Sequence, residues 1–186
     1  MATVREGTKG ALVIVDVQIA IMKQAWDSSR VISNVATAIQ EARSNGVPVF
    51  WIQHSDDQLP AGSSEWELSP ELSPNPDETI IHKRFASAFE GTDLEKTLED
   101  LNVSHIVLAG AATNFCIRAT AYGALDRGYD LTLVGDAHTT GSMELGSKTI
   151  SAEDIITDLN AVMSWIEYPG RTNKAVSTKE LDFAKL

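Results

Sequence analysis

Three side chains that could carry out chemistry lie far apart in this sequence, yet each follows a short apolar run. The run ALVIV precedes Asp16, TIIH precedes Lys83, and HIVLA precedes the turn that contains Cys116. In open parallel α/β sheets, ligands bind outside the carboxyl ends of the strands. We therefore expect the three side chains to meet at one edge of a sheet. A thiol, a carboxylate and an ammonium gathered there predict covalent catalysis by cysteine.

Cys116 is the candidate nucleophile and the only cysteine of the chain. We place it near the start of a helix, where unpaired backbone N–H groups and the helix dipole favour the thiolate over the thiol. The same N–H groups can stabilise the oxyanion that forms when a thiolate attacks a carbonyl. The alternative is an inert cysteine packed as a small apolar side chain. A single cysteine excludes an internal disulfide and a thiolate-rich metal cluster.

Asp16 and Lys83 are the candidate partners of the thiol. A carboxylate directly after an apolar strand is desolvated on one side, which raises its pKa and makes it a proton acceptor. An ammonium between this carboxylate and a thiolate would lower the pKa of both. The alternatives are a loop-capping Asp16 and a solvated Lys83 at a strand end. Gln18 is a candidate contact to a partner side chain or to substrate, with a simple loop hydrogen bond as the alternative.

The four histidines form no helical H-x-x-x-H pair, and the D-x-H triplet at 136–138 has no second histidine near it in the sequence. Because zinc sites ordinarily need three or four ligands, we predict no metal site and no cofactor. His54 and His138 follow predicted strands, and both are candidates to face the cleft. His138 is either an aid to proton transfer or a histidine without a catalytic role. His105 opens a strand and is interpreted as structural.

Strands and helices alternate along the chain and must position these side chains. Apolar runs predict strands at 11–15, 47–52, 79–82, 105–109 and 129–134, with a further edge strand near 175–177. Helical spacing predicts helices over about 31–42, 93–101 and 115–127 and another after Ser151, which can cap it. Ser28 or Ser29 is the expected cap of the first helix, and Thr92 with Glu95 is the expected capping box of the second. Residues 55–77 are polar and irregular, as in functional loops.

This alternation predicts a doubly wound, mostly parallel sheet with helices on both faces, in one domain over residues 1–186. The formal net charge of −11, without a Lys/Arg cluster, argues against nucleic acid as a partner. No apolar run is long enough to suggest a membrane span, and no signal sequence is recognisable, so we expect a cytoplasmic protein acting on a small molecule.

Several short motifs follow in an order typical of one family. They are DVQ at 16–18, KRFASAF at 83–89, GAATNFC at 110–116, TA at 120–121 and DA at 136–137. The order of these motifs and their positions at strand ends resemble those of the isochorismatase-like cysteine hydrolases. The resemblance extends over about residues 11–140. The resemblance implies a three-layer α/β/α sandwich, a homodimer or homotetramer, and a catalytic triad of Asp16, Lys83 and Cys116. It also implies a cis peptide between Ala111 and Ala112, with the N–H groups of Ala112 and Cys116 as the oxyanion hole.

The departures from the family narrow the predicted activity. Nicotinamidases of this family have an Asp-x-His after the second strand and a further histidine that bind a metal. The corresponding segment here reads WIQHS. True isochorismatases typically lack the cysteine, so Cys116 favours a carbonyl substrate. Members similar to streptothricin hydrolases and N-carbamoyl amidases lack the metal motif and resemble this chain more.

We therefore predict hydrolysis of an amide-type C–N bond through a thioester. The candidate substrate contacts are Gln18, His54, Trp66, Phe85, Phe89 and Phe115. For the phenylalanines the alternative is core packing, and Trp66 is interpreted as part of a lid or of a subunit interface. The alternatives for function are nicotinamidase or isochorismatase activity, a noncatalytic metabolite-binding module, and an oxidation-sensing cysteine.

Overall fold

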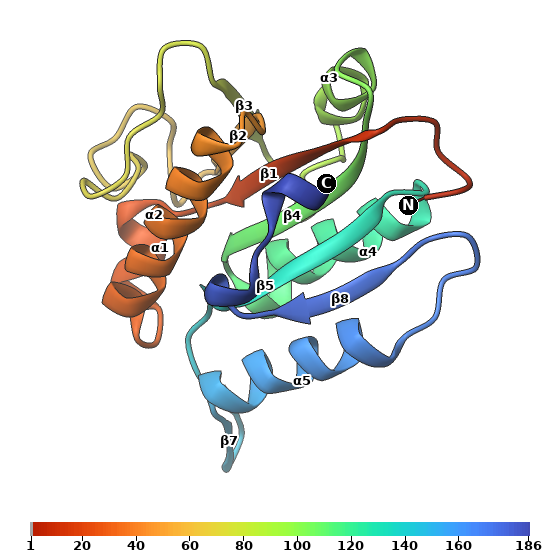
Figure 1. Cartoon of the computed structure of the whole chain (residues 1–186). Helices are drawn as coiled ribbons and strands as arrows, with labels where there is room; N and C mark the ends of the chain where they lie inside the picture. The colour runs from red at the N-terminus through yellow and green to blue at the C-terminus, as the bar shows by residue number, and fades with distance from the viewer. Residues whose placement is uncertain (1) are drawn as a thin grey trace.

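The structure, a computed structural model, describes residues 2–186, and its centre is a sheet in which all pairings between neighbouring strands are parallel (Figure 1). The strand order across the sheet is β3-β2-β1-β4-β5-β8. The strands, in chain order, are β1 (Lys9–Val15), β2 (Val49–His54), β3 (Thr79–Lys83), β4 (Val103–Ala111), β5 (Asp130–Thr139) and β8 (Asn173–Val176).

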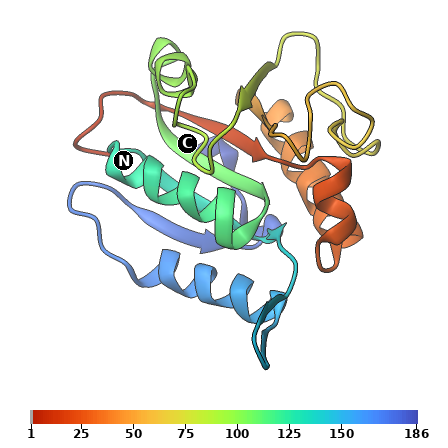
Figure 2. The same cartoon turned by 180° about the vertical axis from the view of Figure 1, so that it is seen from behind.

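Helices cover both faces of the sheet and complete a three-layer α/β/α sandwich, which confirms the predicted fold class. The helix α2 lies on one face, and α3, α4 and α5 lie on the other, as the two opposite views show (Figures 1 and 2). The α-helices are α1 (Ile19–Gln24), α2 (Ser28–Ser44), α3 (Leu94–Asp100), α4 (Arg118–Asp126) and α5 (Ala152–Trp165).

The central strand β1 shows why the sheet is covered on both sides. Side chains of a strand alternate between its two faces. Ala11, Val13 and Val15 accordingly join the core under α3, α4 and α5, whereas Leu12 and Ile14 join the core under α2. All five are completely buried. A continuous apolar, β-branched run is what a strand buried on both faces requires.

The strand order reverses at β1, which pairs with β2 on one side and with β4 on the other. The connection after β1 passes over one face of the sheet, and the helix after β4 packs on the opposite face, so a crevice opens between the carboxyl ends of β1 and β4. Gly110 makes the close contact of the two strands possible. Its φ is +121°, and a Cβ atom there would lie 2.0 Å from the Val15 carbonyl oxygen.

The structure differs from the sequence prediction at several helix starts. Asp27 rather than Ser28 or Ser29 is the N-cap of α2, and Asp93 rather than Thr92 is the N-cap of α3. The capping box predicted at α3 is wrong because Glu95 instead pairs with Arg5 and Arg127. At α5, in contrast, the N-cap Ser151 accepts a hydrogen bond from the Asp154 N–H, as predicted.

Two short elements were not predicted. The helix α1 follows β1 almost directly, and the antiparallel hairpin of β6 (Met143–Leu145) and β7 (Lys148–Ile150) projects from the body before α5 (Figure 2). Residues 55–77 are largely irregular, as expected, although Leu68 forms an isolated bridge to Gln18. The loop therefore packs back on the segment that follows β1.

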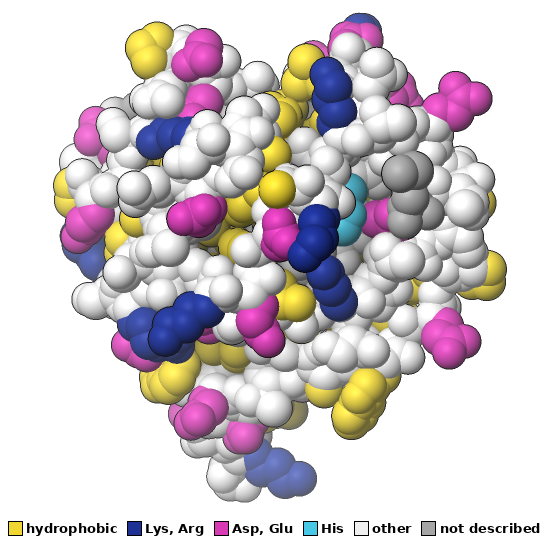
Figure 3. All heavy atoms as spheres, viewed as in Figure 1, with side chains coloured by type: hydrophobic (Ala, Val, Ile, Leu, Met, Phe, Trp, Pro, Cys, Tyr) yellow, Lys and Arg dark blue, Asp and Glu magenta, His cyan; other side chains and the backbone are white. Residues whose placement is uncertain are grey.

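The surface of the described residues mixes both charges. On the face seen in Figure 3, Lys and Arg side chains are interspersed with Asp and Glu. Among residues 2–186, no helix combines the length and the apolar character needed to cross a bilayer.

Candidate active site

The structure brings Asp16, Lys83 and Cys116 together. The Lys83 Nζ atom lies 2.8 Å from the Asp16 Oδ2 atom and 3.2 Å from the Cys116 Sγ atom. The side chains of Asp16 and Lys83 are completely shielded from solvent, and Cys116 is half-buried. A single ammonium group thus contacts both the carboxylate and the sulfur.

The strand order explains how this contact forms. Asp16 directly follows β1 and Lys83 ends β3, with β2 between these strands. The long lysine side chain spans the end of β2 to reach the carboxylate, and its Nζ also donates to the Phe85 carbonyl at 3.2 Å. Asp16 has a left-handed backbone with φ of 52°. Such conformations in non-glycine residues are costly and are concentrated at functional sites.

Burial sets the protonation of this group of side chains. It raises the pKa of the Asp16 carboxyl, against the opposing effect of the Lys83 ammonium. Burial, and next the Asp16 carboxylate, raise the pKa of the Cys116 thiol to about 12, again against Lys83. Burial and the Asp16 charge thus favour the thiol in the resting state, against the stabilisation of the thiolate that was expected from the helix start. The thiol needs a base, and the Asp16 Oδ1 atom accepts no hydrogen bond from the described residues.

Cys116 lies in a π-helical turn, Thr113–Ile117, that links β4 to α4. The Ala112 carbonyl accepts hydrogen bonds from the Phe115 and Ile117 N–H groups, which fixes the start of the turn. The peptide bond between Ala111 and Ala112 is cis, the isomer that the family resemblance implied.

His138 was a candidate to face the cleft, but it does not. Its side chain instead contacts the turn that contains Cys116. It is buried within β5, where its Nδ1 atom lies 2.9 Å from Thr113 Oγ1 and its Nε2 atom 2.9 Å from Asn160 Oδ1. Burial lowers its pKa to about 4, so the imidazole is neutral. His138 therefore links the nucleophile turn to α5.

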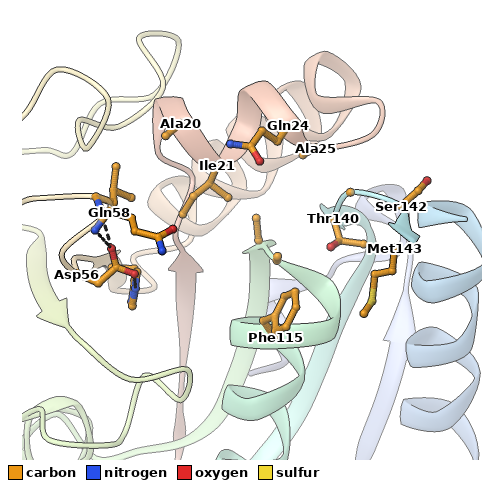
Figure 4. Close-up of a pocket in the computed structure, with 15 residues that line it drawn as sticks. Ala20, Ile21, Gln24, Ala25, Asp56, Gln58, Phe115, Thr140, Ser142 and Met143 are labelled. Carbon is orange, nitrogen blue, oxygen red and sulfur yellow. Dashed lines mark hydrogen bonds and ion pairs between the residues drawn. The ribbon is translucent and has the colours of Figure 1, made fainter. Parts of the chain in front are cut away.

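A cavity of about 560 Å³ opens at the carboxyl ends of the strands (Figure 4). Its walls come from α1, from the segment after β2, from the turn before Cys116 and from the segment after β5. The lining residues are Ala20, Ile21, Gln24, Ala25, His54, Asp56, Gln58, Leu59, Ala111, Ala112, Phe115, Thr140, Gly141, Ser142 and Met143. Ala112 and Phe115, which belong to the segment that leads to Cys116, line the cavity, whereas the side chains of Asp16, Lys83 and Cys116 are not among its lining residues.

Two of the predicted substrate contacts, His54 and Phe115, line this cavity. Gln18 does not, because its side chain is buried and bonds to the His54 and Trp66 backbones. Phe85 is half-exposed outside the lining.

The remaining two predicted contacts pack elsewhere. Trp66 places its ring edge-on against His82, with centroids 5.1 Å apart. Phe89 is a core residue stacked on Tyr129, which is the alternative considered for it.

Sequence reasoning missed the walls supplied by α1, by Asp56 and Gln58, and by Thr140 to Met143. The apolar pair Ile19 and Ile21, shortly after β1, is the sequence signal that indicates α1. Asp56 and Gln58 lie inside the polar, irregular segment 55–77, whose sequence is typical of functional loops. Within residues 2–186, no group of three or more His, Cys, Asp or Glu side chains is arranged to hold a metal ion.

The fold and the site together define a class: a doubly wound α/β protein with a Cys, Lys and Asp cluster at the switch point of its sheet. A family model described as the isochorismatase domain matches residues 10–167. The chain belongs to this family.

Relatives and solved structures agree with this assignment. The chain is 31% identical over 137 residues to a streptothricin hydrolase of Streptomyces noursei. The matched region covers 70% of this chain and 54% of the relative. It thus spans about half of that protein. It is 28% identical to nicotinamidase 3 of Arabidopsis thaliana, over 75% of this chain and 78% of the relative. The crystal structure of an isochorismatase from Pseudomonas putida is similar with a TM-score of 0.83 and 25% identity, over 95% of this chain and 93% of that one.

Proposed function

We propose that this protein is a hydrolase that cleaves an amide-type C–N bond of a small molecule through a thioester on Cys116. The observation that carries the proposal is the Lys83 ammonium within hydrogen-bond distance of both the buried Asp16 carboxylate and the sulfur of Cys116, whose chain neighbour Phe115 lines a cavity. The names of two relatives, a streptothricin hydrolase and a nicotinamidase, support the C–N bond as the target.

The proposed reaction starts with proton transfer. In the resting state Cys116 is a thiol, because its pKa is raised to about 12. Asp16, whose own pKa is raised by burial, accepts the thiol proton as the sulfur attacks the amide carbonyl carbon. Lys83 holds both groups in place and offsets the negative charge on them.

The tetrahedral intermediate then collapses. In this proposal the N–H groups of Ala112 and Cys116 stabilise its oxyanion. The C–N bond breaks, Asp16 gives its proton to the leaving nitrogen, and the acyl group stays on Cys116 as a thioester. Water then attacks the thioester, Asp16 takes a proton from that water, and the released sulfur is reprotonated. The products are a carboxylic acid and an amine or ammonia.

An ammonia-release screen over small amides, lactams and ureido acids tests the proposal, with nicotinamide in the panel. We expect turnover by the wild-type protein and a loss of at least about a thousandfold in Cys116→Ala. Circular dichroism checks that the variant is folded. A folded Cys116→Ala protein with full turnover would exclude the cysteine mechanism.

Mass spectrometry separates an enzyme from a noncatalytic binding module. Acid quenching during turnover should trap a protein whose mass is increased by the acyl group of the substrate. This species should be absent in Cys116→Ala. A wild-type protein that binds an amide but yields neither acyl-enzyme nor product would be the binding module. The predicted homodimer or homotetramer stays a prediction, which light scattering during size-exclusion chromatography measures.

A further inference from the structure

The charge of the cavity wall points to the kind of amide that the site accepts. The cavity lining contains one carboxylate, that of Asp56, one imidazole, that of His54, and no Lys or Arg. Ammonium and guanidinium groups are the side chains that ordinarily bind a substrate carboxylate. This lining therefore offers a substrate carboxylate no cationic partner.

Asp56 is fixed in place by three hydrogen bonds. Its Oδ1 atom accepts from the Gln58 and Leu59 N–H groups, both at 2.8 Å, and its Oδ2 atom lies 3.1 Å from His54 Nε2 (Figure 4). The bond with His54, followed by the two backbone bonds, lowers the pKa of Asp56. The carboxylate is therefore negative at neutral pH, and these hydrogen bonds hold it at the cavity wall.

Among the described residues no Lys or Arg lines the cavity, and the His54 imidazole beside Asp56 carries a positive charge only when it is protonated. The Lys83 ammonium is bound to the buried Asp16 carboxylate. Arg84 points to solvent and lies 3.7 Å from Asp57, and neither residue lines the cavity. Figure 4 shows Asp56 at one side of the cavity and Met143 at the other, with Phe115 between them, so one side of the cavity is negative and the side across from it is apolar.

We propose that Asp56 makes this site select amides that carry a positively charged group and disfavour amides that carry a carboxylate. The inference rests on the proposed amide hydrolysis and gives it a substrate class. Two opposite charges a few ångströms apart near a protein surface attract each other modestly, and salt weakens this attraction. A preference of about tenfold or more at low ionic strength is therefore expected, and it should shrink at about 0.5 M NaCl.

Three amides with the same four-methylene spacer test the preference: 5-aminopentanamide, 5-hydroxypentanamide and adipamate, which end in an ammonium, a hydroxyl and a carboxylate. We expect kcat/KM to fall in this order at pH 8, above the range in which imidazoles ordinarily titrate. Asp56→Asn should reduce the ratio of kcat/KM between the ammonium and carboxylate amides to within about threefold of one. The matched control Asp57→Asn removes the same charge from the neighbouring, fully exposed residue and should keep the wild-type ratio.

Calorimetric binding to Cys116→Ala separates this inference from the proposed function, because it measures occupancy without turnover. Tighter binding of the ammonium amide without any product in the wild-type protein would overturn the proposed function and support the role of Asp56. Equal binding and equal rates for the three amides would overturn the role of Asp56, as would an unchanged ratio in Asp56→Asn. Failure of the ammonium amide to bind would overturn it as well.

Discussion

Replacing Lys83 by Met is the most direct test of the buried ion pair. The Nζ–Oδ2 distance of 2.8 Å corresponds to an attraction of about 6 kcal/mol at an effective dielectric constant of about 20. The desolvation of both groups offsets much of it. Lys83→Met leaves the Asp16 carboxylate buried without its partner, and removing one partner of such a pair ordinarily costs about 3–5 kcal/mol. We expect this decrease in the free energy of unfolding.

A double-mutant cycle shows whether the decrease comes from the pair. In Asp16→Asn/Lys83→Met neither charge remains, so the double variant should be more stable than the sum of the two single losses predicts, by about 2 kcal/mol or more. Denaturation in urea at pH 7, followed by tryptophan fluorescence, measures each variant. Lys96→Met is the matched control, because Lys96 forms a solvent-exposed pair with Asp100, and such pairs contribute little to stability. Additive losses, or a Lys83→Met loss no larger than that of Lys96→Met, would refute the reasoning.

Two further predictions concern acid stability and backbone geometry. The folded protein keeps His105 and His138 neutral down to about pH 4, whereas the unfolded chain protonates them near pH 6.5. The unfolded state thus binds more protons, and each histidine should cost about 3 kcal/mol of stability as the pH falls from 6.5 to 4. Urea denaturation across this pH range should show that the free energy of unfolding of the variant with both histidines replaced by Gln falls less steeply with pH. An equal dependence on pH in the variant and the wild type would show that the two histidines do not cause the loss. Gly110→Ala should destabilise by more than about 3 kcal/mol, because its Cβ would collide with the Val15 carbonyl. The control Gly46→Ala, with φ of +68° and open space around it, should cost only about 1–2 kcal/mol in the same assay, and equal losses would exclude the collision.

The sheet and the reactive cluster could be predicted because local patterns encode them. A run such as ALVIV is apolar at every position, and this indicates a strand buried on both faces. The parallel arrangement then places the ends of such strands at one edge, which is why Asp16 and Lys83 could be expected to meet although they are 67 positions apart.

The cavity walls could not be predicted in the same way. The helix α1 has only six residues and no side-chain cap, so its one sequence signal is a short apolar pair, and the hairpin residues Met143–Leu145 are all exposed, so they show no alternation between buried and exposed positions. Phe89 and Phe115 have the same side chain, yet one stacks in the core and the other lines the cavity. The direction of each ring depends on its tertiary neighbours rather than on its place in a motif. The same holds for Asp56, whose orientation depends on His54.

The position of β1 between β2 and β4 has a consequence for a chain cut at Gly91, an exposed residue with a left-handed backbone. The first fragment would carry Asp16 and Lys83, the second would carry Cys116, and each would have one unsatisfied strand edge that the other matches. Association of the two pieces would thus rebuild the surroundings of the sulfur from separate polypeptides. Such a pair would report complementation through the alkylation rate of Cys116, and a rate unaffected by mixing would show that the two edges do not join.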